Sequence, residues 1–198
     1  MATYRSRLCR RLARSLILGL VTGAGLSAAA AAQVPVVPGA VVSGVLSFDG
    51  RATLGDFTGT TTTMTGEFSG GPDLTSVHGW VEAPVRTLRT GKGKRDTDMN
   101  KSMESDKYPT IRYELTGVTQ GVWSGDTAQV TLLGRFLIHG VTREAEIPAR
   151  VTVTAGQVRV EGSTPLNLKD YRIGGLTKFL GTIRMHEDIV VRLDVTFG

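Results

Sequence analysis

A fifteen-residue stretch near the C-terminal end of the chain, Ile183 to Phe197, alternates between apolar and polar side chains. Seven of its eight odd-numbered positions are apolar, and six of its seven even-numbered positions are polar. Because side chains of a β-strand point alternately to two faces, this period of two predicts a half-buried strand. At about 3.3 Å per residue the strand is roughly 50 Å long. Such a length is typical of a strongly twisted barrel or sandwich rather than of a small flat sheet.

The first 32 residues have the composition of a secretory signal peptide. Five arginines and no acidic residue lie in the first fourteen positions, an apolar run follows, and the alanines before Gln33 offer an A-x-A cleavage site. The apolar part is too short for a stable membrane span. We expect residues 1–32 to be removed on export to the bacterial periplasm or the exterior, and residues 33–40 to form a linker. Arg10 and Arg11 leave open whether export follows the general secretory or the twin-arginine route.

Charge and cysteine content exclude several classes of function for the mature chain. Of 23 basic residues five lie in the leader, which leaves 18 basic against 18 acidic residues. The positive charge of the whole chain therefore belongs to the leader and gives no support for nucleic-acid binding. The single cysteine, Cys9, also lies in the leader. We therefore expect no disulfide, no thiol catalysis and no cysteine metal site.

From Val41 onward, short alternating runs separated by turn signals predict one all-β domain over residues 41–198. Asp49-Gly50 is expected to turn the chain after the first strand. One helix is predicted, from Arg95 to Ser105, with Asp96 or Thr97 as its cap. The expected strands span residues 41–48, 57–69, 74–85, 108–115, 127–138, 145–153, 158–168 and 183–197.

Eight or nine antiparallel strands must hide their edges, and closure into a barrel does so. An eight-stranded barrel has an interior that side chains fill or that holds one slender ligand. Small residues on the inward faces either leave a cavity or relieve crowding and let strands bend, and their spacing leaves both interpretations open. They are Gly66, Gly79, Ala83, Ala128, Gly134, Ala145 and Ala149.

Three segments carry a family resemblance through their order and spacing. They are Thr87–Gly91 with Arg95-Asp96 and Tyr108–Tyr113, then Phe136–Arg143 (FLIHGVTR), then Leu166–Ile173 (LNLKDYRI). Together they resemble the YceI-like family of secreted polyisoprenoid-binding proteins. The family's opening tryptophan and Asp-Pro pair are missing, and Met99 stands where a histidine or similar residue often follows the Arg-Asp pair. The resemblance implies an eight-stranded lipocalin-like antiparallel barrel with one short helix, whose tunnel holds a long isoprenoid tail such as a quinone or polyprenyl chain.

Eight large apolar side chains, two of them on the predicted helix, are the candidate lining of such a tunnel, with ordinary core packing as the alternative for each. They are Phe48, Phe68, Leu88, Met99, Met103, Tyr113, Phe136 and Ile189. Burying four isoprene units, about twenty carbons, gives on the order of 15 kcal/mol at about 0.8 kcal/mol per carbon. Association costs about 4–15 kcal/mol, so micromolar or tighter affinity needs no specific polar contact.

Three polar residues are candidates for contact with a ligand head group: Arg95, Asp96 and Glu187. Glu187 lies on the apolar face of the last strand, so its carboxylate needs a polar partner. That partner is Arg95, Arg184, a ligand head group, or water at a barrel end. Lys92, Lys94 and Arg95 precede the predicted helix, whose first amides favour anions. They either meet a pyrophosphate head or form a solvated loop.

No catalytic site, metal site or cofactor is predicted. His78, His139 and His186 occur singly, have outward parity and lack metal-ligand spacing. We expect a non-enzyme that binds a long-chain isoprenoid or similar lipid, as carrier or store. The alternative is a ligand-free exported barrel with a stress-response or surface-interaction role. We expect no nucleic-acid partner and no stable membrane span, and the sequence leaves a homodimer open.

Overall fold

The computed structural model describes residues 39–70, 76–119, 121–174, 177–178 and 183–198. The expected signal peptide and most of the expected linker lie outside these residues. So does the beginning of the strand expected at 74–85.

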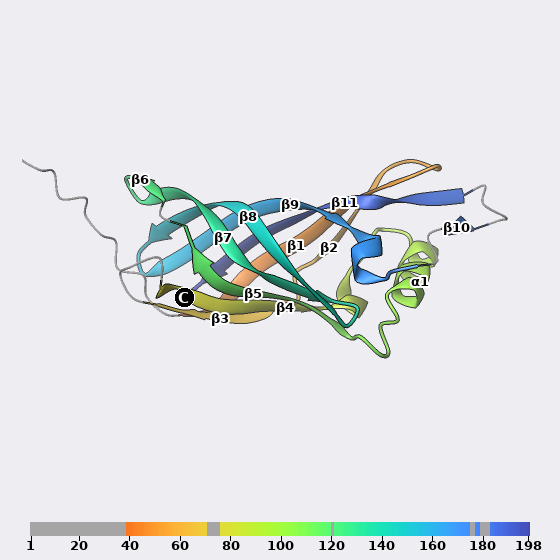
Figure 1. Ribbon diagram of the computed structural model, residues 1–198, viewed down its shortest axis with the longest axis horizontal. Coiled ribbons are helices and arrows are strands. Elements are labelled where there is room, and N and C mark those ends of the chain that lie inside the picture. Colours follow the sequence, from red (N-terminus) through yellow and green to blue (C-terminus); the bar gives the residue numbers. More distant parts are fainter. Residues whose placement is uncertain (1–38, 71–75, 120, 175–176, 179–182) are drawn as a thin grey trace, which may run out of the picture. The chain divides into compact units, whose positions relative to one another are not determined.

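Strands dominate the described part of the chain, with one α-helix and short 3-10 helices between them (Figure 1). The strands are β1 (Gly39–Ala52), β2 (Phe57–Thr61), β3 (Thr65–Ser69), β4 (His78–Pro84), β5 (Thr110–Val118), β6 (Val122–Ser124), β7 (Thr127–Ile138), β8 (Val141–Thr154), β9 (Gln157–Asn167), β10 (Thr177–Lys178) and β11 (Ile183–Phe197). The helices are α1 (Gly93–Ser102) and the 3-10 helices η2 (Val85–Thr87) and η3 (Leu168–Tyr171).

Eight strands close an antiparallel barrel in the order β1-β3-β4-β5-β7-β8-β9-β11, and β11 pairs with β1 to complete the ring. The short β2 continues the position of β3 alongside β1, and β6 continues the position of β5 alongside β7. The predicted fold class, an eight-stranded barrel with one helix, is confirmed. Because β11 pairs with both β1 and β9, the strand predicted over 183–197 forms the seam of the barrel.

The turn predicted at Asp49-Gly50 is wrong. Both residues continue in β1, where they pair with β11 on one side and β2 on the other. The carboxylate of Asp49 accepts a hydrogen bond from the Thr58 hydroxyl at 2.8 Å and forms an ion pair with Arg192. These cross-strand partners hold Asp49 in the sheet. The chain turns instead after Ala52, where Gly55 takes a positive φ of 104°.

The helix was expected at Arg95–Ser105 and forms two to three residues earlier, at Gly93–Ser102. Neither expected cap residue caps it, since the N-cap position is Lys92 and makes no side-chain hydrogen bond. The Asp96 carboxylate instead accepts hydrogen bonds from the backbone N–H of Thr90 at 2.8 Å and the Thr90 hydroxyl at 2.6 Å. These bonds lower the pKa of Asp96. The sequence identified the helix, but its first turn is fixed by a tie to the preceding segment.

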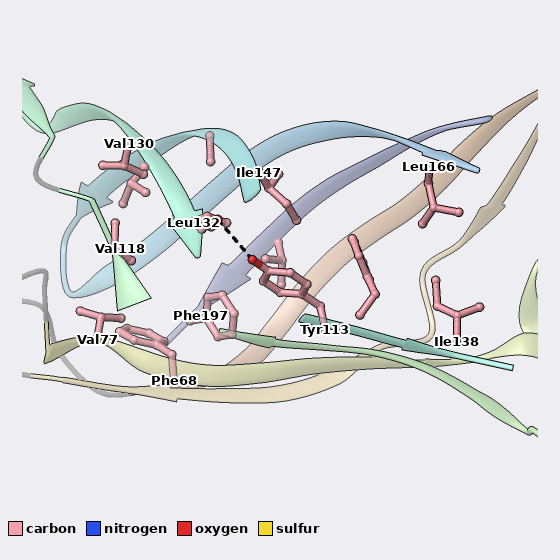
Figure 2. Packing of buried hydrophobic residues seen from close by; sticks show 14 of the residues in the cluster. Phe68, Val77, Tyr113, Val118, Val130, Leu132, Ile138, Ile147, Leu166 and Phe197 are labelled. Carbon is pink, nitrogen blue, oxygen red and sulfur yellow. Dashed lines mark hydrogen bonds between the residues drawn. The ribbon is translucent and has the colours of Figure 1, made fainter. Parts of the chain in front are cut away.

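Side chains fill the half of the barrel farther from α1 (Figures 1 and 2). Within it the rings of Phe68 and Phe197 meet edge to face at 4.9 Å. Tyr113 lies between this packed half and the residues near Ile138 and Leu166 (Figure 2). The packed half includes Phe68, Val77, Val118, Val130, Leu132 and Phe197.

Glycines among the small inward residues relieve crowding. A Cβ atom on Gly134 would lie 2.2 Å from the Glu114 carbonyl oxygen and 2.7 Å from the Tyr113 ring. A Cβ atom on Gly66 would lie 2.3 Å from the Trp80 carbonyl oxygen. These glycines allow close approach of neighbouring strands and side chains, so crowding explains Gly66 and Gly134.

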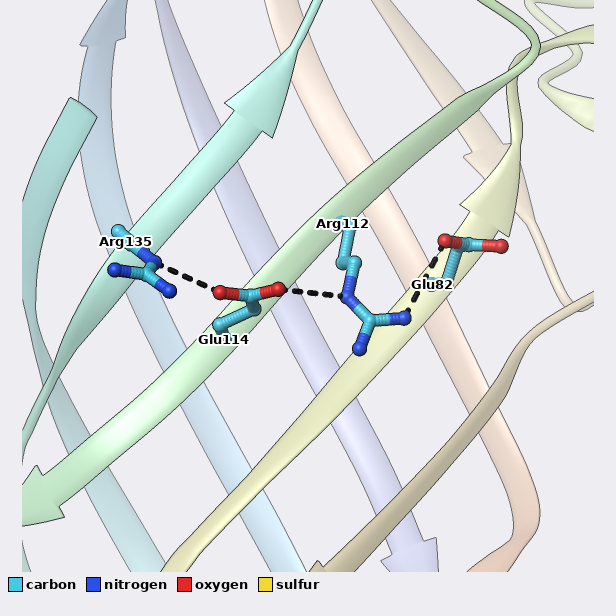
Figure 3. Close-up of polar contacts among 4 residues, drawn as sticks. All are labelled: Glu82, Arg112, Glu114 and Arg135. Atoms are coloured by element: carbon cyan, nitrogen blue, oxygen red, sulfur yellow. Dashed lines mark hydrogen bonds and ion pairs between the residues drawn. The ribbon is translucent and has the colours of Figure 1, made fainter. Parts of the chain in front are cut away.

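A ladder of alternating charges crosses the outer face of β4, β5 and β7 (Figure 3). Arg112 lies 3.6 Å from Glu82 and 3.1 Å from Glu114, and Glu114 lies 2.7 Å from Arg135. Hydrogen bonds from Arg135 and then Arg112 lower the pKa of Glu114. The Arg112 guanidinium also lies 4.2 Å from the ring centre of Trp80, on the same outer face. Because the charges satisfy one another, the ladder supports strand register.

Candidate ligand-binding cavity

An apolar cavity of about 460 Å³ occupies the end of the barrel that α1 overlies. Its size is within the range of about 300–1,000 Å³ that is usual for small-molecule sites. Its walls come from β1, β2, β5, β7, β9 and β11, from η3, and from the segment that includes α1. The apolar lining consists of Leu46, Phe48, Ala52, Leu54, Phe57, Leu88, Met99, Met103, Ile111, Phe136, Ile138, Leu166, Leu168, Ile173, Met185, Ile189 and Val191.

The segment before α1 is held against β2 by main-chain and side-chain hydrogen bonds. Thr60 and Arg89 exchange two backbone hydrogen bonds of 2.9 Å. The hydroxyls of Thr61 and Thr87 lie 2.7 Å apart. This docking directs Leu88, which is 3 % exposed, into the cavity. It also carries the chain across the barrel end into α1.

His139 links the β7–β8 turn to η3 and to the segment after α1, and its ring is buried, whereas its parity predicted an outward position. The side chain is 8 % exposed, and its Nδ1 lies 3.0 Å from the Tyr171 carbonyl oxygen. Its ring meets Tyr108 edge to face at 4.6 Å, and its Nε2 lies 3.5 Å from a Glu104 carboxylate oxygen. Parity fails here because His139 lies in the β7–β8 turn with φ of 52°, beyond the end of the strand. The other two histidines, His78 and His186, are exposed as predicted.

Tyr113 lies behind the deep end of the cavity, where its ring backs Phe136. Its ring lies 4.9 Å from that of Phe136, which lines the cavity, and a void of only about 30 Å³ lies beside Tyr113. The Tyr113 hydroxyl is 3.4 Å from the carbonyl oxygens of Leu132 and Ala145. Burial, and less strongly the nearby charge of Glu144, raise the pKa of Tyr113, so the phenol stays neutral. The cavity is therefore a pocket with a floor and does not run through the barrel.

Six of the eight predicted lining residues contact the cavity: Phe48, Leu88, Met99, Met103, Phe136 and Ile189. The two others, Phe68 and Tyr113, do not line it. Phe68 packs on Phe197 in the filled half, and Tyr113 belongs to the floor. Alternation along a strand predicts which face a residue occupies, but it does not predict how deep along the barrel axis that residue lies.

Several cavity residues escaped the sequence analysis for identifiable reasons. Ile111, Ile138 and Met185 have the inward parity that would have selected them. Ala52 and Leu54 follow the wrongly placed turn at Asp49-Gly50, so no strand pattern indicated them.

Basic side chains line the cavity together with the apolar ones. Lys92, Lys94, Arg95 and Arg184 belong to the lining. The guanidinium of Arg95 lies 4.0 Å from the ring centre of Phe57, a distance that permits a cation–π contact. Of the three predicted head-group residues, the structure thus brings only Arg95 to the cavity.

Glu187 does not line the cavity, and its carboxylate forms ion pairs with two basic side chains. Its Oε1 lies 2.6 Å from Nζ of Lys169 and 2.8 Å from Nη2 of Arg184. Hydrogen bonds from Lys169, from its own backbone amide and from Arg184 lower the pKa of Glu187 to about 2. Of the partners expected from the sequence, Arg184 is confirmed and Arg95 is not.

A second hollow, of about 900 Å³, lies on the outer face of β1, β7, β8, β9 and β11. It is open to solvent and is lined by charged as well as apolar side chains, among them Arg150, Glu161 and Arg192. An enclosed and mainly apolar wall is the usual property of a small-molecule site. The smaller cavity under α1 is the more enclosed and the more apolar of the two.

Within the described residues, no three or more His, Cys, Asp or Glu side chains cluster closely enough to hold a metal ion. A search of the same residues for a helix long and apolar enough to cross a membrane finds none.

Comparison with known proteins agrees with this geometry. A family model described as YceI-like domain matches residues 40–197. Among solved structures, Burkholderia cenocepacia BcnA is 11% identical with a TM-score of 0.64, over 77% of this chain and 95% of that one. A polyisoprenoid binding domain from Saccharophagus degradans is 13% identical with a TM-score of 0.67, over 80% and 96%. A Campylobacter jejuni YceI protein is 14% identical with a TM-score of 0.54, over 70% and 82%. No curated protein matches the chain. At these identities the solved structures show a shared fold.

Proposed function

Because the chain belongs to the YceI-like family, we propose that its cavity binds the apolar tail of one isoprenoid or similar lipid. The observation that carries this proposal is the partly enclosed apolar cavity between α1 and the Phe136 ring. The similar fold from Saccharophagus degradans is described as a polyisoprenoid binding domain, which supports the choice of tail. The described lining contains neither histidine nor cysteine, which favours binding over catalysis.

The cavity volume sets how much tail it encloses. If each methylene-sized group takes about 30 Å³, the volume of one water molecule in the liquid, then the 460 Å³ cavity holds about fifteen such groups. That is roughly three isoprene units, whose burial at about 0.8 kcal/mol per carbon gives on the order of 12 kcal/mol. After an association cost of about 4–15 kcal/mol, micromolar affinity is feasible. A longer quinone or polyprenyl chain would keep its remaining units outside the mouth.

The proposal includes an exported carrier or store. The arginine-rich start, the apolar run and the alanines before Gln33 support a periplasmic or secreted location. A barrel that encloses a tail lets an insoluble lipid cross an aqueous compartment, because the apolar carbons are removed from water.

Two measurements on the native protein test the proposal. Organic-solvent extraction of protein purified from its host, followed by mass spectrometry, is expected to release about one isoprenoid or lipid per chain. Calorimetric titration of stripped protein with farnesol, which has fifteen carbons, is expected to show one site. Repeated absence of any extracted lipid, together with no farnesol uptake, would favour a ligand-free barrel with a stress-response or surface-interaction role.

A matched pair of variants locates the binding site. Ala52 lines the cavity, whereas its neighbour Arg51 is exposed on the same strand. Ala52→Phe places a ring in the cavity and is expected to weaken farnesol binding at least ten-fold. Arg51→Phe adds the same ring outside and is expected to leave binding unchanged. Equal effects of the two substitutions would contradict binding in this cavity.

A further inference from the structure

We infer that the cavity selects amphiphiles with an anionic head group, a carboxylate or a phosphate, and holds that head at the basic mouth while the tail lies inside. This inference rests on the proposed function and specifies its ligand class. Its basis is the combination of an enclosed apolar volume with a rim of unequal charge.

The described lining contains four cationic side chains and one carboxylate. The cations are Lys92, Lys94, Arg95 and Arg184, and the carboxylate is that of Asp98. The rest of the lining is apolar or uncharged. A tail that enters the cavity therefore brings its head to a rim where positive charge is in excess.

The cations at the rim differ in how far other side chains neutralise them. Arg184 is paired with Glu187 at 2.8 Å. Lys92 and Lys94 are exposed and have neither an ion pair nor a hydrogen bond from their side chains within the described residues. The nearest acid in sequence, Asp96, has its carboxylate hydrogen-bonded to Thr90. At least two lysine ammonium groups are thus available to an incoming anion.

Arg95 occupies the position where head and tail would meet. Its side chain is half-buried, and its guanidinium lies over the face of Phe57, which lines the cavity. Phe57 in turn meets Phe48 edge to face at 6.0 Å. Aromatic surface beside a cation excludes water on that side, and a charge pair is stronger where less water surrounds it. The first turn of α1, which has no side-chain cap, adds a weaker attraction of the same sign.

A neutral head would gain none of these interactions, so identical tails with different heads give a direct comparison. We pair farnesyl phosphate with farnesol, and palmitate with hexadecanol, all below their micelle concentrations. At about 10 mM salt, where charge interactions extend roughly 30 Å, each anion is expected to bind at least ten-fold more tightly than its alcohol. At about 1 M salt, where they extend roughly 3 Å, the ratio is expected to fall towards one. A preference confined to the phosphate pair would assign a phosphate head, and one confined to palmitate would assign a carboxylate.

Charge reversal on one helix provides the matched control. Lys94 lines the cavity, whereas Lys101 lies in the last turn of α1 and does not. Lys94→Glu is expected to reduce the preference for the anion over the alcohol at least three-fold, and Lys101→Glu, outside the lining, is expected to change neither this preference nor the farnesol affinity. Lys92→Glu repeats the test at the adjacent cavity residue.

The outcomes separate the two proposals. The head-group inference would be overturned if anion and alcohol bound with equal affinity, or if Lys94→Glu and Lys101→Glu had equal effects. In either case, farnesol binding would still support the cavity function. The inference would also be overturned if the double variant Lys92→Glu/Lys94→Glu bound the anions with the same affinity as the native protein. Failure of all four ligands to bind would overturn the cavity function and this inference together.

Discussion

Shortening Tyr113 should lengthen the tail that the cavity accepts. Phe136 lines both the 460 Å³ cavity and the deeper void of about 30 Å³, and the Tyr113 ring lines the void and packs on Phe136. Tyr113→Ala deletes the phenol group, seven non-hydrogen atoms, and so makes room for about one isoprene unit. Burial of five more carbons at about 0.8 kcal/mol each gives up to about 4 kcal/mol. Since about 1.4 kcal/mol is a ten-fold change in affinity, even half of this gain is easily measured.

The assay compares prenyl alcohols of ten, fifteen and twenty carbons. For the native protein, Kd is expected to fall between ten and fifteen carbons and then to level off, because the floor stops further entry. For Tyr113→Ala, Kd is expected to keep falling to twenty carbons by at least ten-fold. Removal of a buried aromatic ring costs about 3–5 kcal/mol of stability, so Tyr113→Leu serves as a less destabilised second variant.

Phe68→Ala is the matched control, since Phe68 is a buried ring that touches neither the cavity nor the void. It is expected to lower stability without moving the length at which Kd levels off. A native protein whose Kd keeps falling to twenty carbons would refute the assignment of Tyr113 as the floor. The same break at fifteen carbons in Tyr113→Ala would refute it too.

Three further predictions concern stability. Gly134→Ala places a Cβ atom 2.2 Å from the Glu114 carbonyl oxygen. We therefore expect the free energy of unfolding, measured in urea, to fall by about 1–3 kcal/mol. An unchanged urea midpoint would contradict the close packing. The folded-state pKa of Glu187, about 2, lies below its ordinary value of 4.5, so its ion pairs stabilise the fold above that value and the stabilisation is lost as pH falls towards 2. Between pH 5 and pH 2 the Tm of the native protein should therefore fall more than that of Glu187→Gln, and parallel curves would argue against the network. His139→Ala removes a buried ring and its hydrogen bond, and we expect it to destabilise the fold by about 1–3 kcal/mol. His139→Asn should destabilise the fold less, because asparagine tolerates the positive φ at this position. Equal destabilisation by the two variants would mean that the backbone conformation does not matter.

The sequence predicted the elements whose pattern is long and regular. The alternation over 183–197 corresponds to β11, and the run over 127–138 corresponds to β7, each with the expected bounds. Both strands have one face in the barrel and one face outside, so the period of two is complete along their length. The helix pattern was also found, although its start depends on the Thr90–Asp96 tie, which no local pattern indicates.

Predictions failed where a residue's role depends on partners distant in sequence. Asp49-Gly50 has the composition of a turn, but Arg192 and Thr58 hold Asp49 in a continuous strand. His139 lies in a turn, where strand parity no longer applies. The same limit applies to the site: six of the eight predicted lining residues line the cavity, whereas the position of Tyr113 and Phe68 along the barrel axis depends on strand register around the ring.

The most direct test of an apolar tail in the cavity follows the methionine methyl groups by NMR. Met99, Met103 and Met185 line the cavity, whereas Met64 packs outside the lining beside Gly44. With ¹³C-methyl methionine, saturating farnesol is expected to shift the first three signals and to leave that of Met64 in place. Farnesol binding that shifts Met64 but none of the other three would contradict the cavity under α1 as the binding site.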